Sequence, residues 1–467
     1  MSETAAVKPN MPNTPAGKVV TRFAPSPTGL LHAGNYRTAL FSYLFARKHG
    51  GTFLLRIEDT DKARSKKEYE DNIIESLKWL GIEYDGFDRQ SDRVEIHKKY
   101  LQKLIDSGHA YISKETPKNP GDRGEVIRFK NPNKKVRFDD LIRGTIEFDT
   151  TDLHDFVIAR SMDEPVFHLV VVVDDHEMGI THIIRGEDHI SNTPRQILIY
   201  EALGLTPPLY AHIPLLLAPD RSKLSKRKGA LPITDYRDRG FLKDAIVNYM
   251  ALLGWNPAVK DDAGAEREIF SREELVALFD LSKVQKGAAI FNEEKLAWMN
   301  KLYISKLSEG EFAEHVKPFI FPGLDITTPK NIKLLKLIRE KIHSFGEIKS
   351  LFLPEGELSF ASKAGVPEYK KESLMWRQEK DIAQTKTHLK YAIDTLGALP
   401  DSPLEFTLEK IKAAIWPYAE KIGKGNVLWP MRYALSGKDK SPDPFIMMDI
   451  LGKAESLERL MRAHDAI

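Results

Sequence analysis

The chain has 467 residues, of which 42% are hydrophobic and 29% are charged, and its formal net charge is +2. This length predicts about three domains, and the composition is that of an ordinary globular protein. The sequence contains no cysteine, which excludes disulfides, thiolate catalysis and cysteine-ligated zinc sites. Because the net charge is small, an argument for a nucleic-acid partner has to rest on local basic clusters.

No run of about 18 or more apolar residues occurs, so we expect no membrane span and no membrane partner. Residues 1–17 are rich in Pro, Ala, Asn and Thr and lack an apolar segment. This composition predicts a disordered tail and not a signal peptide. The expected location is therefore cytoplasmic.

The first hundred residues alternate between apolar strands and amphipathic helices. The expected elements are, in order, a strand at Val19–Ala24, a loop at 25–29, a helix from about Gly34 to His49, a strand at Thr52–Ile57, and helices at Lys66–Leu80 and Arg93–Ser107. Strand, helix and strand at this spacing form a βαβ unit. A parallel, doubly wound sheet is therefore favoured.

The character of the sequence then changes twice. From about 110 to 185, segments such as VIRFK, GTIEFDT and FHLVVVV predict a β-rich region. A helix is expected at Thr193–Leu203 and a strand at His212–Leu217, followed by a basic loop. Helices are expected from Leu242 to the end. The pattern predicts an α/β core interrupted by a β-rich insert and followed by an all-helical region.

The segment FAPSPTGLLHAGN contains the first motif with chemical content. A strand, a Gly/Pro loop and a helix start direct backbone N–H groups and a helix N-terminus toward an anion. His32 and Asn35 lie three residues apart on the first helical turn and face the same side. An imidazole there can donate to a phosphate as charge develops in a transition state. The alternative is a turn shaped by Pro and Gly with an exposed histidine.

The second motif is the segment Lys223–Gly229, which gathers four basic residues around one serine. A cationic loop suits a leaving pyrophosphate, which gains negative charge as the α-phosphate is attacked. The alternative is a solvated basic loop or a nonspecific nucleic-acid patch, which this motif alone would favour.

Together the two motifs resemble the signature pair of the class I aminoacyl-tRNA synthetases. The segment from Pro25 to Asn35 is similar to the HIGH signature in the PSPTGxxHxG form of the glutamyl/glutaminyl group, with Asn35 in place of histidine. Residues 223–227 resemble the KMSKS signature, with Arg227 in place of serine. The similarity covers about 19–303 and again 425–462, and it is closest to bacterial-type glutamyl-tRNA synthetases.

The resemblance implies a fold of three parts: a Rossmann-like catalytic core, a reduced β-rich insert, and an all-helical anticodon-binding region. The expected division is a disordered tail at 1–17, the first half of the core at 18–108, a reduced acceptor-stem-binding insert at 109–186, the second half of the core and a stem-contact region with the KLSKR loop at 187–304, and the anticodon-binding region at 305–467. The zinc knuckle that the family often carries is missing by length as well as by cysteine, so no zinc is expected.

The resemblance also assigns site residues. The implied catalytic residues are His32, Asn35, Lys223 and Lys226. The implied ATP-binding residues are Pro25, Thr28, Gly29, His32, Gly34 and Lys226. The implied glutamate-binding residues are Arg22, Ala24, Ser26, Glu58, Phe167 and Arg185. Within the last set, Glu58 would bind the α-ammonium, Arg185 a carboxylate and Arg22 the side-chain carboxylate.

Four positions qualify this assignment. Asn35 donates a hydrogen bond but cannot carry the charge of a histidine. Phe167 stands where the family has a pocket-lining tyrosine, so one hydrogen bond to the substrate is lost and weaker or reshaped glutamate binding is expected. Asp174 and Asp175 match an acidic pair of the family, and a structural role at a strand end is as well supported as a functional one.

The implied activity is ATP-dependent ligation of L-glutamate to the 3′ end of tRNA, with Mg²⁺ accompanying ATP and tRNA bound at its acceptor stem and anticodon. A monomer is the default expectation. Two alternatives stay open: a non-discriminating form that also charges tRNA for glutamine, and a tRNA-binding paralogue that has lost catalysis. A glutaminyl enzyme would carry β-barrel anticodon domains, and a truncated enzyme that glutamylates queuosine would lack the helical region. A small-molecule nucleotidylyltransferase would need neither RIEDTD nor the basic loop.

Overall fold

The structure of the chain is a computed structural model that describes residues 17–116, 124–222, 224, 231–320, 328–362, 367–379, 381–402 and 404–467. The chain divides into two compact units. The first runs to Asp238 and continues over Leu242–Met299, and the second comprises Arg239–Phe241 and Asn300–Ile467. Across the described ranges, no helix combines the length and apolar character needed to cross a membrane.

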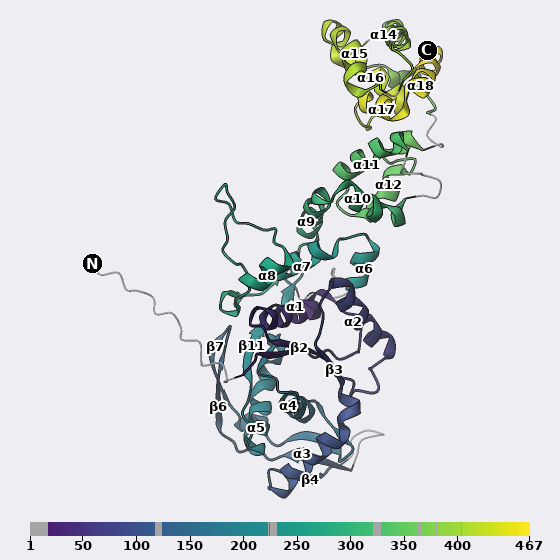
Figure 1. The fold of residues 1–467 in the computed structure, drawn as a ribbon. Helices are drawn as coiled ribbons and strands as arrows, with labels where there is room; N and C mark the ends of the chain where they lie inside the picture. Colours follow the sequence, from purple (N-terminus) through teal and green to yellow (C-terminus); the bar gives the residue numbers. More distant parts are fainter. Residues whose placement is uncertain are drawn as a thin grey trace, which may run out of the picture. The chain divides into compact units, whose positions relative to one another are not determined.

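The first unit is built on a seven-stranded sheet with the order β3-β2-β1-β10-β11-β6-β7 (Figure 1). Neighbouring strands are parallel except β6 and β7, which form an antiparallel hairpin. The strands of this sheet are β1 (Val20–Phe23), β2 (Thr52–Ile57), β3 (Gly86–Arg89), β6 (Lys135–Asp140), β7 (Gly144–Asp149), β10 (His182–Gly186) and β11 (Leu209–Ile213).

Two smaller sheets complete the strands of this unit. One is antiparallel, with the order β4-β5-β8-β9, and the other pairs β12 with β13 in parallel. Their bounds are β4 (Ala110–Lys114), β5 (Glu125–Phe129), β8 (Phe156–Ser161), β9 (Glu164–Pro165), β12 (Leu216–Leu217) and β13 (Ala289–Ile290).

Helices cover both faces of the large sheet, with α1 on one face and α4 and α5 on the other (Figure 1). The helices that begin in this unit are α1 (Ala33–Lys48), α2 (Lys67–Leu80), α3 (Val94–Asp106), α4 (Phe167–Glu177), α5 (Thr193–Leu203), α6 (Ile233–Asp238), α7 (Lys243–Leu252), α8 (Arg272–Leu278) and α9 (Glu293–Lys306). A sheet covered on both faces needs strands that are apolar along their length, as β2 (TFLLRI) is.

Most elements of the first hundred residues lie where the sequence predicts them. The strand at Thr52–Ile57 and the helix at Thr193–Leu203 have the predicted bounds, and the three helices predicted within the first 107 residues differ by at most one residue at each end. Two of these helices stop at glycines in the left-handed region, Gly81 with φ 68° and Gly204 with φ 71°. Glycine adopts this conformation without the steric cost that a Cβ would add.

The predicted strand at FHLVVVV is wrong, because this segment is helix α4. Its apolar positions Leu169–Val173 are all buried. A short apolar run with no polar face has the same appearance in a buried strand and in a buried helix, and the four valines favoured the strand. Asp174 and Asp175 therefore lie in the last turns of a helix and not at a strand end.

The described residues of the second unit form helices and no strand, which confirms the predicted α/β core with a helical C-terminal region. Its helices are α10 (Glu309–Val316), α11 (Pro329–Lys341), α12 (Ile348–Phe352), α13 (Lys371–Leu374), α14 (Ile382–Gly397), α15 (Leu408–Ile422), α16 (Lys424–Ser436), α17 (Pro444–Leu451) and α18 (Lys453–Asp465). Helix α14 packs against α16 and α18, and α15 packs against α16 and α17. Buried apolar residues such as Leu389, Ile411 and Met431 fill the space between them.

The finer division at 109, 187 and 305 stays a prediction. Within the stretch 109–186, β6, β7 and β10 belong to the large sheet, and β4, β5, β8 and β9 form the separate antiparallel sheet. The hairpin of β6 and β7 thus extends the sheet that carries the site.

Candidate active site

The carboxyl ends of the central strands surround a cavity of about 400 Å³. It lies beside β1, whose two neighbours in the sheet are β2 on one side and β10 on the other. The chain order of the strands reverses at this point. Ligands of open α/β sheets bind at such a switch point. The predicted residues that line the cavity are Arg22, Ala24, Pro25, Ser26, Thr28, His32, Gly34, Asn35, Glu58, Phe167 and Arg185. Gly29 lies in the same loop but is not part of the lining, and Lys223 and Lys226 lie outside the described residues.

His32 is positioned by the change from loop to helix. It is the N-cap residue of α1, with an extended backbone at φ −113° and ψ 168°, and its backbone pairs with that of Pro232. A Cβ at Gly34 would lie 3.3 Å from Cε1 and 3.4 Å from Nδ1 of the His32 ring, so the glycine leaves room for the imidazole. Because His32, Gly34 and the exposed Asn35 all line the cavity, the N-terminus of α1 faces it. A helix N-terminus is a favourable place for a phosphate.

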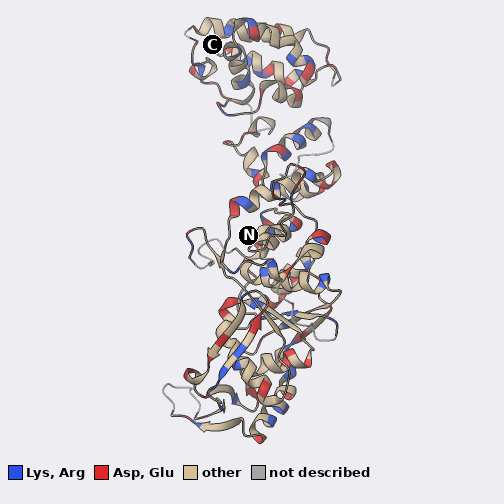
Figure 2. Cartoon of the chain, turned by 90° about the vertical axis from the view of Figure 1, so that its left-hand side faces the viewer, with Lys and Arg blue, Asp and Glu red and all other residues tan. Residues whose placement is uncertain are grey.

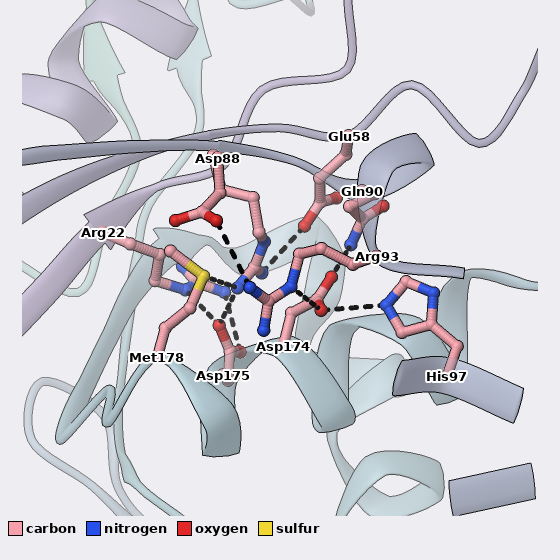
Figure 3. Close-up of polar contacts among 10 residues, drawn as sticks. Arg22, Glu58, Asp88, Gln90, Arg93, His97, Asp174, Asp175 and Met178 are labelled. Carbon is pink, nitrogen blue, oxygen red and sulfur yellow. Dashed lines mark hydrogen bonds and ion pairs between the residues drawn. The ribbon is translucent and has the colours of Figure 1, made fainter. Parts of the chain in front are cut away.

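A buried network of ion pairs connects β1, β2 and α4 (Figure 3). Arg22 donates from Nε to Asp175 Oδ1 at 3.0 Å and from Nη2 to Oδ2 at 3.3 Å. Arg56 donates from Nη1 to Asp175 Oδ1 at 2.7 Å and from Nη2 to Glu58 Oε1 at 3.0 Å. Two cations thus alternate with two carboxylates, and each of these buried charges has an opposite charge beside it.

The two carboxylates of this network differ in how well they are compensated. Burial alone would raise the pKa of Asp175, yet the charges of Arg22 and Arg56 hold it below its ordinary value. For Glu58, burial raises the pKa and outweighs the opposing charges of Arg56 and Arg22. Glu58 lines the cavity and has less compensation than Asp175, so a cationic ligand would stabilise its charged form.

Asp174 connects α4 to the neighbouring α3 and to the short 3₁₀ helix η1 (Gln90–Arg93). Its Oδ1 lies 2.7 Å from Arg93 Nε and 2.8 Å from His97 Nε2, and its Oδ2 accepts from Gln90 Nε2 at 3.1 Å (Figure 3). Neither Asp174 nor Asp175 is part of the cavity lining. Their contacts are those of residues that hold helices and strands together beside the site.

Arg185 is a buried cation whose hydrogen-bond partners among the described residues are all uncharged groups. Its Nε lies 3.1 Å from His212 Nε2, and its Nη2 donates to Thr193 Oγ1 and Gln196 Oε1, both at 2.8 Å. Burial lowers the pKa of Arg185 to about 10, because no adjacent carboxylate offsets the cost of burying the charge. An anionic ligand in the cavity would supply that missing charge.

Phe167 is the first residue of α4 and lines the cavity. Its ring centroid lies 5.4 Å from that of His168 and 5.8 Å from that of His189. Burial lowers the pKa of both histidines to about 4, so at neutral pH both rings are uncharged. This wall of the cavity is therefore aromatic and neutral.

Two models of known protein families match the chain. The family model of the class I tRNA synthetases (E and Q), catalytic domain, matches residues 18–120 and 118–298. The chain belongs to this synthetase family. A second model, the anticodon binding domain, matches residues 311–464 of the synthetase, in its helical region.

Individual relatives align with most of the synthetase chain. A glutamate–tRNA ligase of Aquifex aeolicus is 42% identical over 482 residues, covering 95% of this chain and 98% of the relative. One of Hydrogenobaculum is 46% identical over 386 residues, covering 74% and 82%. A crystal structure of a glutamate tRNA ligase from Elizabethkingia meningosepticum, in complex with its amino acid, has a TM-score of 0.84 at 30% identity and covers 96% of this chain and 99% of that one.

Several residues in and behind the cavity of the synthetase are not among those predicted from the sequence. Arg56 is wholly buried in β2 and pairs with two carboxylates, and a charged residue inside the apolar run TFLLRI was a signal for it. His212 contacts Arg185, and Asp140 contacts His212. The sequence predicted that His212 lies in a strand but gave it no function. No local pattern marks Asp140, whose partner is 72 residues away along the chain.

Basic and acidic residues alternate along much of the described part of the synthetase. Figure 2 shows Lys and Arg interleaved with Asp and Glu along both units. Four basic residues between 114 and 143 are paired with carboxylates: Arg128 with Glu115, Lys134 with Glu201, Lys135 with Glu147, and Arg143 with Glu187. Lys118 and Arg123 lie outside the described residues. The local clusters expected from the sequence are thus largely pairs of opposite charge.

Proposed function

We propose that this synthetase is a glutamate–tRNA ligase, which activates L-glutamate with ATP and transfers it to the 3′ end of tRNA. The names of its relatives support this activity. The observation that carries it is the charge pattern of the cavity, where Arg185 and Arg22 face one space with Glu58. Two cations and one carboxylate complement the two carboxylates and one ammonium of glutamate.

Each charged group of glutamate has a proposed partner. Arg185 binds one carboxylate, because it is buried among uncharged acceptors. Arg22 binds the side-chain carboxylate, with Asp175 holding its Nε and Nη2 and leaving Nη1 for the ligand. Glu58 binds the α-ammonium, whose positive charge stabilises the ionised carboxylate that burial disfavours. Ala24, Ser26 and Phe167 complete the amino-acid pocket.

ATP is proposed to bind beside this pocket at the N-terminus of α1. Pro25, Thr28, Gly29 and Gly34 shape the loop and the first turn, and His32 and Asn35 donate toward the phosphates. Lys223 and Lys226 of the basic loop would neutralise the leaving pyrophosphate. Magnesium enters as part of the MgATP substrate. The described residues contain no cluster of three or more His, Asp or Glu side chains placed to hold a metal ion, and Mg²⁺ is commonly held by substrate phosphates with few protein ligands.

The reaction has two steps. An oxygen of the glutamate α-carboxylate attacks the α-phosphorus of ATP, the bond to the β-phosphate oxygen breaks, and pyrophosphate leaves. A hydroxyl of the terminal ribose of tRNA then attacks the carbonyl carbon of the adenylate, loses its proton, and AMP leaves with the bonding electrons. No side-chain nucleophile is required, so catalysis rests on positioning and on charge stabilisation.

The helical region that matches the anticodon binding domain is proposed to hold the anticodon, and the β-rich stretch to contact the acceptor stem. A cytoplasmic location is proposed, since the product is consumed in protein synthesis. A monomer is proposed as the simplest state.

Glutamylation of two transcripts, tRNA for glutamate and tRNA for glutamine, tests the proposal in the presence of MgATP. Charging of the first alone indicates a discriminating ligase, and charging of both indicates a non-discriminating one. Failure to charge either transcript, with tRNA binding intact, would refute the activity and favour a lapsed paralogue.

A further inference from the structure

Asp140, His212 and Arg185 lie on three adjacent strands of the large sheet. Arg185 of β10 and His212 of β11 are direct partners in the parallel register, and Asp140 ends β6, the next strand in the order. All three are buried: Asp140 is 4% exposed, His212 0% and Arg185 6%. Of the three, only Arg185 lines the cavity.

Asp140, His212 and Arg185 form a row of hydrogen-bonded side chains, and the direction of each bond follows from the chemistry of the groups. Asp140 Oδ2 lies 2.6 Å from His212 Nδ1 and accepts from the backbone N–H of His212 at 3.0 Å. An ionised carboxylate only accepts, so the proton of the imidazole is on Nδ1. In the neutral ring Nε2 then has a lone pair, and it accepts from Arg185 Nε at 3.1 Å.

We propose that Asp140 and His212 are positioning residues that hold the Arg185 guanidinium in place for a substrate carboxylate. The inference deepens the proposed function and rests on it. Asp140 fixes the tautomer of His212, and this tautomer presents an acceptor to Arg185 Nε. Thr193 and Gln196 fix Nη2 from the other side, so the guanidinium plane is held at two edges. Such orientation by a residue behind a binding group is a common way to fix its geometry.

The positioning pair depends on the hairpin of β6 and β7. Asp140 Oδ1 accepts from the backbone N–H groups of Ile142 and Arg143 at 3.0 and 2.9 Å, which closes the turn of the hairpin. Arg143 donates from Nε to the carbonyl of His212 at 3.2 Å and pairs with Glu187 at 2.5 Å. The carboxylate behind Arg185 is therefore supplied by a turn that is itself fastened to β11.

The row also predicts a dependence on pH. The titratable and charged groups that act on His212 are Asp140 on β6, Arg143 in the turn, and Arg185 on β10; Tyr210 of its own strand stacks on its ring, and His189 follows β10. Burial and the positive charges of Arg185 and Arg143 lower the pKa of His212, and the carboxylate of Asp140 raises it. The net effect is a lowered pKa. Protonation at acid pH would place an N–H and a positive charge against Arg185 Nε, so the KM for glutamate should rise as the pH falls through the lowered pKa of His212.

The test is steady-state glutamylation of tRNA by the full chain, with the KM for glutamate and the KM for ATP measured separately. In Asp140→Asn the amide donates to Nδ1, the imidazole proton moves to Nε2, and Nε2 can no longer accept from Arg185. We expect the KM for glutamate to rise about tenfold or more, with the KM for ATP within about twofold of the wild type. Asp139→Asn is the matched control, because Asp139 is exposed on the same strand and bonds only Thr145 Oγ1 among the described residues. Its KM for glutamate should not change.

His212→Gln provides a second variant that cannot titrate. Its amide offers a donor toward Asp140 and an acceptor toward Arg185, so the KM for glutamate should stay closer to the wild type than in Asp140→Asn. Its rise at acid pH should be smaller than that of the wild type, and the remaining rise comes from protonation of Glu58. Circular dichroism and thermal unfolding of each variant measure the folded fraction. Equal KM values for glutamate in Asp140→Asn and Asp139→Asn, or a uniform loss in kcat and both KM values, would overturn the positioning role. A wild-type chain that charges no tRNA overturns the proposed function itself.

Discussion

Arg56 and Asp175 form an ion pair at 2.7 Å in which neither side chain is exposed to solvent. Arg56 comes from the central strand β2 and Asp175 from the helix α4 on one face of the sheet. The same carboxylate holds Arg22, which lines the cavity. One residue of α4 thus fixes both the packing of a helix on the sheet and the position of a binding side chain.

The substitution Asp175→Asn should lower the free energy of unfolding by about 3–5 kcal/mol, because it leaves Arg56 and Arg22 buried with less opposite charge. The charges of these arginines hold the pKa of Asp175 below its ordinary value. A carboxylate with a depressed pKa in the folded state contributes stability above its unfolded pKa and loses it as pH falls through the folded pKa. The difference from the wild type should therefore be constant between about pH 5 and 8, as measured by urea denaturation.

Asp71→Asn is the matched control for this prediction. Asp71 pairs with Lys67 at 2.9 Å, but the two side chains are 61% and 64% exposed. An exposed pair of this kind contributes less than about 1 kcal/mol. Equal losses of stability in the two variants would contradict a special role for the buried pair.

The sequence predicted the parts of the site that local patterns define. The loop between β1 and α1, the strand β2 and the arginine at the end of β10 follow from apolar runs that end in charged or Gly/Pro segments. These features place Arg22, Glu58 and Arg185 near the carboxyl ends of strands and His32 at the start of the helix that follows β1, and all four line one cavity. Because the carboxyl ends of parallel strands meet at one edge of the sheet, this prediction needs no knowledge of which distant residues contact each other.

The parts that failed depend on packing between distant segments. The run FHLVVVV forms a helix because all of its sides are covered in the fold, which its composition does not reveal. Arg56 is buried inside β2 beside Glu58 and beside Asp175, and Asp175 lies 119 residues away along the chain. Asp140 acquires its place from the pairing of β6 with β11, and neither strand carries a signal for the other.

The substitution Arg185→Gln should weaken glutamate binding about 100-fold without lowering stability. Two charge-assisted hydrogen bonds to a carboxylate are lost, at about 1.5 kcal/mol or more each. Stability should be kept, because burial lowers the pKa of Arg185 and its removal relieves an uncompensated buried charge. Isothermal titration with glutamate and thermal unfolding measure the two effects. A loss of stability with unchanged affinity would instead assign Arg185 a structural role.

The substitution Phe167→Tyr should tighten glutamate binding by up to about tenfold. Phe167 lines the cavity and has a neutral aromatic wall beside it, so a hydroxyl on its ring can reach the ligand space. A net hydrogen bond contributes about 0.5–1.5 kcal/mol. The KM for glutamate in glutamylation is the measurement, and Phe167→Leu serves as the control for ring packing. If the tyrosine variant binds no better than the wild type, water already supplies the missing hydrogen bond.

The substitution Gly34→Ala should separate activity from stability, with opposite signs for the two. Gly34 is the second residue of α1, and alanine in a helix is more stable than glycine by up to about 1 kcal/mol. The new Cβ would lie 3.3 Å from the His32 ring, which has to shift by a few tenths of an ångström. Displacement of a group that stabilises a transition state should lower kcat, by about tenfold if half of a typical contribution is lost.

Gly287→Ala is the control for this variant, because a Cβ at Gly287 meets no atom within 4 Å. Its kcat should equal that of the wild type. A Gly34→Ala variant with raised melting temperature and lowered kcat would locate the effect in the site, at His32 or at the ATP beside Gly34, since general damage to the fold lowers both. Unchanged kcat in Gly34→Ala would mean that the imidazole does not act on the phosphates, and the role proposed for His32 would have to be given up.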